Sequence, residues 1–406
     1  MRRIGMLTSG GDCQALNATM RGVAKSLYNM FDDVEIIGFE DGYKGLMYAD
    51  YQIMKSSDFS GILTQGGTIL GTSRQPFKLM RTPDENGLDK VEAMKHTYKK
   101  LKLSCLVVLG GNGSQKTANM LSEEGLNVVS LPKTIDNDLC VTDHTPGYGS
   151  AAKYVASTLL EIGHDTSIYP IKSVTIVEIM GRDAGWLTGA SVLARNKYNF
   201  APHLIYLPEV PFVEEEFIED VKAAMEKYNN VVIAVSEGIK DANGKYVSAT
   251  TAVEDTFGHS QLSGTGKCLE YIIKQNIQVK VRSVEINILQ RSAAHMSSIT
   301  DIGEAFRLGR HAINISIEGK TGVMVTAIRK ANDPYCVTMS DTPVQNVAGL
   351  VKHVPREWIN ARGNDVTQEF IDYAYPLILG EPVVKYQRGI PDYLDISHLF
   401  PNMNDK

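Results

Sequence analysis

The sequence lacks several features that would assign it to a familiar class of protein. Only five of its 406 residues are cysteine, and they are scattered without any CxxC pair, which argues against a disulfide framework or a zinc site. No apolar run approaches the ~20 residues that cross a membrane. The chain also opens without the apolar segment of a signal peptide. We therefore expect a cytoplasmic protein that has no membrane partner.

An excess of positive charge is also missing. The chain has 41 Lys and Arg against 47 Asp and Glu, which gives a formal net charge of −6. Nucleic-acid-binding proteins usually carry a basic surface, so we expect no nucleic-acid partner. The hydrophobic share of 43% is that of an ordinary globular protein. At ~150 residues per domain, the length corresponds to two or three domains.

What the sequence does contain is an alternation of short apolar runs and amphipathic stretches. The apolar runs predict strands at residues 4–8, 34–39, 105–109, 126–131, 174–180, 204–207, 231–236 and 281–289. The amphipathic stretches predict helices at residues 16–27, 115–124, 186–194, 214–228 and 302–317. Strands that alternate with helices favour parallel sheets. We expect an α/β fold with two doubly wound, three-layer α/β domains and the active site in the cleft between them.

Three loops that follow predicted strands carry residues suited to phosphate. Residues 8–12 contain a Gly-Gly pair, and residues 110–114 contain glycine at three of four successive positions. Glycine lets the backbone approach a phosphate, and the helix that follows directs its N–H groups at it. Residues 132–138 combine a lysine, a hydroxyl and two carboxylates, which suits charge stabilisation and proton removal. Each loop alone also fits a tight turn or a polar surface loop.

Taken together, these loops resemble the phosphofructokinase family. The motifs that carry the resemblance are LTSGGD at 7–12, GTILGTSR at 67–74, GGNGS at 110–114, PKTIDND at 132–138, MGR at 180–182, SEG at 236–238 and LQR at 289–291. The resemblance covers roughly residues 1–330, and the remaining residues are less informative. It implies transfer of a phosphoryl group to the 1-hydroxyl of fructose 6-phosphate, with Mg²⁺ as cofactor. It also implies a donor-binding domain of residues 1–140 plus about 292–320, and a fructose-6-phosphate domain of 141–291 plus part of 321–406.

The resemblance implies a role for individual residues as well. The phosphoryl donor would be held by Gly11, Arg74, Gly111, Asn112, Gly113 and Ser114. The catalytic group would be Asp136 as general base, with Lys133, Thr134 and Arg182. The sugar phosphate would be bound by Thr134, Asp136, Met180, Gly181, Arg182, Glu237, Arg282 and Arg291. Arg282 would reach in from a neighbouring subunit, which implies a homodimer or homotetramer.

The sequence departs from the family pattern at a few of these positions. Asn112 stands where ATP-dependent relatives usually carry an Asp near magnesium, so the metal would rely on Asn112 weakly and on Asp138, Asp136 or water. Ile288 replaces the histidine of the common HIQR motif. These departures leave room for a catalytically weak regulatory homologue, although the retained general base and arginines favour an enzyme.

The phosphoryl donor is the sharpest question that the sequence poses. Pyrophosphate-dependent members tend to have Asp at position 113 and Lys at position 133, whereas common bacterial ATP-dependent members have Gly at both. This chain combines Gly113 with Lys133. An Asp at 113 would place negative charge where the α-phosphate of ATP must lie, and glycine removes that barrier. We therefore expect an ATP-dependent 6-phosphofructokinase of glycolysis, with the pyrophosphate-dependent enzyme as the alternative.

Overall fold

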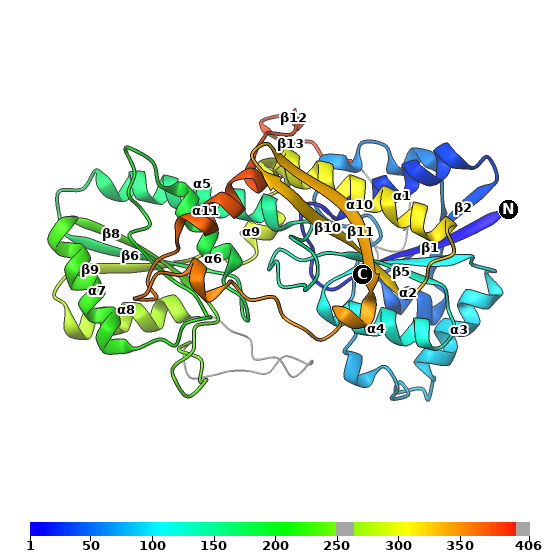
Figure 1. The fold of residues 1–406 in the computed structure, drawn as a ribbon, viewed down its shortest axis with the longest axis horizontal. Coiled ribbons are helices and arrows are strands. Elements are labelled where there is room, and N and C mark those ends of the chain that lie inside the picture. The colour runs from blue at the N-terminus through cyan, green and yellow to red at the C-terminus, as the bar shows by residue number, and fades with distance from the viewer. Residues whose placement is uncertain (249–263, 395–406) are drawn as a thin grey trace.

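A computed structural model describes residues 1–248 and 264–394 and contains two large sheets, each covered by helices (Figure 1). The first sheet has seven strands in the order β11-β10-β5-β4-β1-β2-β3, and the second has four in the order β7-β8-β6-β9. The expected α/β class is therefore confirmed. Residues 249–263 and 395–406, which the expected sugar-phosphate domain includes, lie outside the described residues. Within the described ranges, no helix is both long and apolar enough to cross a membrane.

The first sheet is parallel in its centre and antiparallel at both edges. Its strands are β1 (Arg2–Ser9), β2 (Val34–Phe39), β3 (Tyr51–Met54), β4 (Cys105–Gly110), β5 (Val128–Pro132), β10 (Val323–Asn332) and β11 (Tyr335–Pro343). Because side chains alternate along a strand, Ile4 and Met6 pack on one face of the sheet and Leu7 on the other. The first face carries α1 (Leu16–Met30) and α10 (Ile299–Ile317). The opposite face carries α2 (Tyr43–Tyr48), α3 (Lys90–Lys100) and α4 (Asn112–Glu123).

The second sheet is parallel throughout. Its strands are β6 (Ser173–Ile179), β7 (Leu204–Tyr206), β8 (Asn230–Ser236) and β9 (Lys280–Glu285). One face packs against α5 (Tyr148–Ser167), α6 (Trp186–Ala190) and α11 (Gln368–Ala374). The other packs against α7 (Glu214–Lys227) and α8 (Thr265–Asn276). The short helix α9 (Leu289–Ser292) follows β9, and β12 (Tyr386–Gln387) pairs with β13 (Ile390–Pro391).

One apolar core runs through both halves of the molecule. It contains Ile4 of β1, Val177 of β6 and Tyr148 of α5, all fully buried. Helix α5 contacts α10 as well as α6, so it joins the two sheets on this side.

Three local expectations differ from the observed structure. The helix expected from residue 115 begins at Asn112, so Asn112 and Gly113 lie in its first turn and not in a loop. The strand expected to reach residue 289 ends at Glu285, because the chain then turns into α9. The donor-binding domain is expected to end at about residue 320, whereas the first sheet continues beyond that residue. The apolar start of β10 pairs with β5, Val323 facing Val129, and so extends the first sheet to Pro343.

Candidate active site

A cleft of about 720 Å³ lies between the two sheets, at the ends of strands from both. The predicted residues that line it are Gly11, Arg74, Asn112, Gly113, Lys133, Thr134, Asp136, Asp138, Met180, Arg182, Glu237 and Arg291. The loops come from distant parts of the chain, and the parallel strands bring their carboxyl ends to one place. The structure therefore brings most of the predicted site residues together.

Four predicted residues do not line the cleft. Gly111 precedes α4 as its cap, and the carbonyl of Ser114 accepts a hydrogen bond from the hydroxyl of Tyr43 inside the first domain. Gly181 supports the cleft loop through its backbone, as described below. Arg282 lies on β9, where its Nη2 is 3.0 Å from Asp165 Oδ2 and its Nε donates to Thr175. Within one chain Arg282 does not reach the site, so its role across a subunit interface stays a prediction.

The cleft also contains residues that sequence reasoning missed. They are Asp12, Lys116, Ile135, Glu178, Ile179, Asp183, Glu285, Asn287, Ile288, Gly349 and Val351. Asp12 ends a recognised motif, and Lys116 lies one helical turn after Asn112, so both could have been found from their spacing. Gly349 and Val351 carry no such signal, because they belong to a segment without a recognisable motif.

Several cations gather around the Gly11 loop. A Cβ on Gly11 would lie 2.9 Å from a guanidinium nitrogen of Arg291, so only glycine fits there without displacing the arginine. The Lys133 ammonium is buried and donates to the carbonyl of Gly11. Burial lowers the pKa of Lys133, and the charges of Asp12 and Asp136 oppose that shift. Arg291, which we expected at the sugar phosphate, thus lies against the loop that contains Gly11.

The carboxylates that follow β5 are held in an unusual electrostatic state. Burial raises the pKa of Asp136, although the charge of Lys133 opposes the shift. Burial and the negative charge of Asp136 together raise the pKa of Asp138 to about 7. The pKa of Glu237 also rises to about 7, from burial and from the charge of Asp136. A carboxylate with a raised pKa is a stronger base near neutral pH, which suits proton removal from a sugar hydroxyl.

The two aspartates also fit a magnesium ion. Magnesium is usually held by one or two carboxylates together with the oxygens of a bound phosphate. Asp136 and Asp138 repel each other in a buried site, and a divalent cation would relieve that repulsion. In the described parts of the chain, no group of three or more His, Cys, Asp or Glu side chains forms a ready-made metal site. A magnesium ion here would therefore rely on the donor's phosphate oxygens as well.

Asn112 is held at the cleft by a distant segment of the chain. Its Nδ2 donates to the carbonyl of Leu350 at 2.7 Å, and its Oδ1 accepts from the backbone N–H of Gly349 at 2.7 Å. Both polar atoms of the amide are thus engaged with the backbone of a distant segment. The amide oxygen already accepts one hydrogen bond, and a role of Asn112 toward magnesium stays a prediction.

On the opposite wall, the loop after β8 supports the loop after β6. A Cβ on Gly238 would lie 2.0 Å from the carbonyl oxygen of Arg182, so glycine allows these two backbones to touch. The Ser236 hydroxyl donates to the carbonyl of Gly181 at 2.6 Å, and Glu237 accepts from the N–H of Gly181 at 3.3 Å. The SEG motif at residues 236–238 therefore holds the backbone of the MGR motif at residues 180–182 in place.

A buried glutamine connects the two walls of the cleft. Gln14 lies in the loop between β1 and α1, and its side-chain amide donates to the carbonyl of Gln290 at 2.8 Å. The Gln290 side chain in turn accepts from the backbone N–H of Met180 at 3.3 Å. The donor loop and the sugar-side loop are therefore joined through the residue that precedes Arg291.

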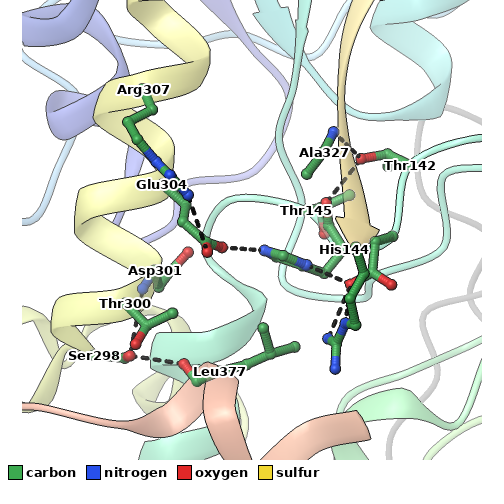
Figure 2. A network of polar contacts seen from close by, with 12 residues as sticks. Thr142, His144, Thr145, Ser298, Thr300, Asp301, Glu304, Arg307, Ala327 and Leu377 are labelled. Atoms are coloured by element: carbon green, nitrogen blue, oxygen red, sulfur yellow. Dashed lines mark hydrogen bonds and ion pairs between the residues drawn. The ribbon is translucent and has the colours of Figure 1, made fainter. Parts of the chain in front are cut away.

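Beneath the Asp136 loop lies a network of buried charges. Figure 2 shows His144 between α10 and β10, with Glu304 on one side of its ring. Its Nδ1 lies 2.7 Å from Asp143 and its Nε2 lies 2.5 Å from Glu304. Burial alone would lower the pKa of His144, but the two carboxylates outweigh it and raise the pKa to about 9. A protonated histidine thus ties the loop after β5 to α10.

The chain beyond β11 holds the same loop from the other side. Asn137 lies between the two aspartates and has a left-handed backbone, with φ of 55°. Its Nδ2 donates to the Tyr373 hydroxyl at 2.7 Å, and its Oδ1 accepts from the Lys352 ammonium at 3.1 Å. The Tyr373 hydroxyl also donates to the carbonyl of Asp143 at 2.7 Å. Residues of the segment that seemed uninformative in sequence therefore fix the backbone of the proposed general base.

Cations and a buried carboxylate pair in an interdomain cleft are what transfer of a phosphoryl group requires. Fold and site together define a two-domain α/β phosphotransferase. Residues 3–316 match the family model described as Phosphofructokinase. The chain belongs to the phosphofructokinase family.

The relatives that this chain resembles include enzymes named as pyrophosphate-dependent and enzymes named as ATP-dependent. The chain is 32% identical over 403 residues to a pyrophosphate–fructose 6-phosphate 1-phosphotransferase of Xanthomonas campestris, covering 96% of this chain and 95% of the relative. It is 36% identical over 362 residues to an ATP-dependent 6-phosphofructokinase of Spirochaeta thermophila, covering 87% and 93%. A solved pyrophosphate-dependent phosphofructokinase from Marinobacter aquaeolei superposes with a TM-score of 0.84 at 27% identity, covering 97% and 95%.

Proposed function

We propose that this protein transfers a phosphoryl group from pyrophosphate to the 1-hydroxyl of fructose 6-phosphate. The observation that carries the proposal is the composition of the donor end of the cleft, which offers Arg74, Lys116 and Lys133 to a compact polyanion. Among the described residues that line the cleft, none is aromatic, so no ring is offered to an adenine base. The pyrophosphate-dependent relatives that match nearly the whole chain support the same donor.

Gly113, which we took to favour ATP, does not decide the donor in this proposal. A Cβ on Gly113 would have no atom within 4 Å, so the residue leaves open space at the start of α4. Open space permits a larger donor but does not bind one. Lys133, by contrast, is buried against the donor loop, where its charge acts on any bound phosphate.

The residues of the cleft have separate tasks in this reaction. Arg74, Lys116 and Lys133 hold the donor. Asp136 takes the proton of the sugar 1-hydroxyl while the oxygen of that hydroxyl attacks the terminal phosphorus of pyrophosphate. The bond to the bridging oxygen breaks, and its electrons leave with orthophosphate. Arg182 offsets the charge on the transferring group. Magnesium, held by Asp138 and phosphate oxygens while Asp136 acts as the base, would supply further charge neutralisation when bound.

ATP is the second candidate donor. The open space at Gly113 and the 36% identical ATP-dependent relative favour it. Arg282 does not line the cleft of its own chain, so the role that the family resemblance implies for it would require a homodimer or homotetramer with either donor.

A side-by-side assay of fructose 1,6-bisphosphate formation with pyrophosphate and with ATP tests the donor. We expect kcat/KM for pyrophosphate to exceed that for ATP by at least about tenfold, which corresponds to about 1.4 kcal/mol. Formation of pyrophosphate from fructose 1,6-bisphosphate and orthophosphate should also be measurable. Equal or better turnover with ATP would overturn the proposal and restore the argument from Gly113.

A further inference from the structure

A short segment after β11 crosses the cleft from the first sheet to the second. We call residues 349–354 the strap; in Figure 1 it forms part of the orange chain that runs from beside α4 toward α6 and α11. In its middle, the N–H of Lys352 donates to the carbonyl of Asp138 at 2.7 Å. At its far end, the carbonyl of Lys352 accepts from the Trp186 indole at 2.8 Å, and the N–H of Val354 donates to Glu209 at 2.9 Å. The strap is thus fastened along its length.

The near end of the strap forms a wall of the donor site. Gly349 and Val351 line the cleft together with Asn112, Gly113 and Lys116 from the first turns of α4. A Cβ on Gly349 would lie 3.1 Å from Cε of Lys116, so strap and helix are in close contact. Any donor that extends past the start of α4 would meet this wall.

Asn112 is the fastening at this end. Its amide pairs with the strap as a second peptide group would, donating to Leu350 and accepting from Gly349 at 2.7 Å each. Leu350 itself is 51% exposed, so its side chain does little to hold the strap down. The side chain of Asn112 therefore supplies two hydrogen bonds to the near end of the strap, beside the backbone bond from the N–H of Leu350 to the carbonyl of Val347 and the packing of Val351 against the core.

We propose that the strap is a gate that limits the size of the phosphoryl donor, with Asn112 as its latch. When the latch is closed, the donor end accommodates two phosphates and excludes the nucleoside of ATP. The proposal rests on the proposed function and adds a physical reason for the donor preference. It also explains how Gly113 coexists with pyrophosphate: the wall that a larger donor would meet is the strap and not a side chain at 113.

The substitution Asn112→Ala tests the gate, because it removes both hydrogen bonds without adding charge or a metal ligand. The matched control is Asn119→Ala, on the exposed side of the same helix, where Nδ2 bonds only Glu123 among the described contacts. Two quantities are measured on the full-length protein: the ratio of kcat/KM for ATP to that for pyrophosphate, and amide hydrogen exchange of the strap by mass spectrometry.

In Asn112→Ala we expect faster exchange in residues 349–352 and a shift of the ratio toward ATP of at least about tenfold. The control should change neither quantity. Faster exchange with an unchanged ratio would overturn the gate, and unchanged exchange would overturn the latch. A wild-type enzyme that prefers ATP would overturn the proposed function and the gate together. In an enzyme whose wild type prefers pyrophosphate, a ratio in Asn112→Ala equal to the wild-type ratio would overturn the gate alone.

Discussion

Asp136 is the residue on which the proposed chemistry depends most directly. Its raised pKa and its place beside Lys133 suit a base that removes the proton of the sugar hydroxyl. We expect Asp136→Asn to lower kcat by a factor of about 10² to 10⁴, the usual contribution of a general base, with a smaller effect on KM. Steady-state kinetics with saturating fructose 6-phosphate measure it. Asp372→Asn, in α11 and exposed, is the control; an unchanged kcat in Asp136→Asn would remove Asp136 from the mechanism.

The raised pKa of His144 predicts how the free energy of unfolding depends on pH. Its pKa is about 9 in the folded chain against about 6.5 in an unfolded chain. The folded state therefore holds a proton between these values that the unfolded state has released. The stabilisation from this group is fully present below pH 6.5 and is lost as the pH rises through 9, by at most about 1.4 kcal/mol per pH unit.

Urea denaturation at several pH values between 6 and 9, on wild type and His144→Gln, measures this effect. Asp143 and Glu304 contact the imidazole directly, and Arg329 and Arg307 pair with those carboxylates. Because these neighbours remain in the variant, the difference between the two proteins isolates the histidine. We expect the gap in unfolding free energy to narrow as the pH rises. A gap that stays constant would mean that His144 is neutral in the folded chain.

At the level of single residues, the sequence predicted what lies within a motif and missed what crosses from elsewhere. Lys133, Asp136 and Arg182 line the cleft as expected because each follows a strand that the apolar pattern predicts. The true partners of Asn112 lie 237 and 238 positions away. No local pattern reports a contact of that separation, so only the structure shows how Asn112 is held.

At the scale of elements, most strands of the two sheets were predicted from their periodicity, as were helices α1, α4, α6, α7 and α10, whereas α3 and α5 were not predicted. The start of α4 was not, because Gly111 and Gly113 are typical of loops while the backbone at Asn112 is already helical. The two strands that extend the first sheet, β10 and β11, were also missed. Their place beside β5 depends on pairing between residues about 190 positions apart, such as Val323 with Val129.

The loop between β5 and α5 depends on the element α11 for its shape. Tyr373 of α11 accepts from Asn137 and donates to Asp143 through one hydroxyl. Removing that hydroxyl leaves two buried polar groups without this partner, at a cost of about 1–3 kcal/mol. We expect Tyr373→Phe to lose stability of that order and to lower kcat more than it raises KM.

Thermal unfolding and steady-state kinetics measure the two effects of Tyr373→Phe. The neighbouring Tyr375 is 55% exposed, so Tyr375→Phe is the matched control and should change neither quantity. A variant that loses stability but retains full kcat would show that α11 supports the fold without positioning the base. Recovery of kcat in Tyr373→Gln, whose amide can still bond Asn137, would support the positioning role.

At the scale of the whole molecule, the role that the family resemblance implies for Arg282 predicts a site shared between subunits. Arg282→Ala and Asp136→Asn should each be inactive or nearly so when assayed alone. In a mixed oligomer, the Arg282→Ala chain retains its own Asp136 and would receive Arg282 from its partner. We expect activity to reappear when the two variants are mixed, unfolded and refolded together. Absence of any recovery, in a sample shown to contain hybrids, would contradict an arginine that acts across the interface.

The apolar core that both sheets share has a consequence for how such proteins change donors over time. Because α5 packs on both halves, a chain cut near residue 140 would expose apolar surface on each fragment. Genetic exchange of a complete donor half between relatives would therefore yield mismatched cores. Change of donor is left to single substitutions at the rim of the cleft, where they alter a contact without disturbing the interior. A lineage could change its phosphoryl donor between pyrophosphate and ATP through a few substitutions, while the two-sheet fold is inherited unchanged.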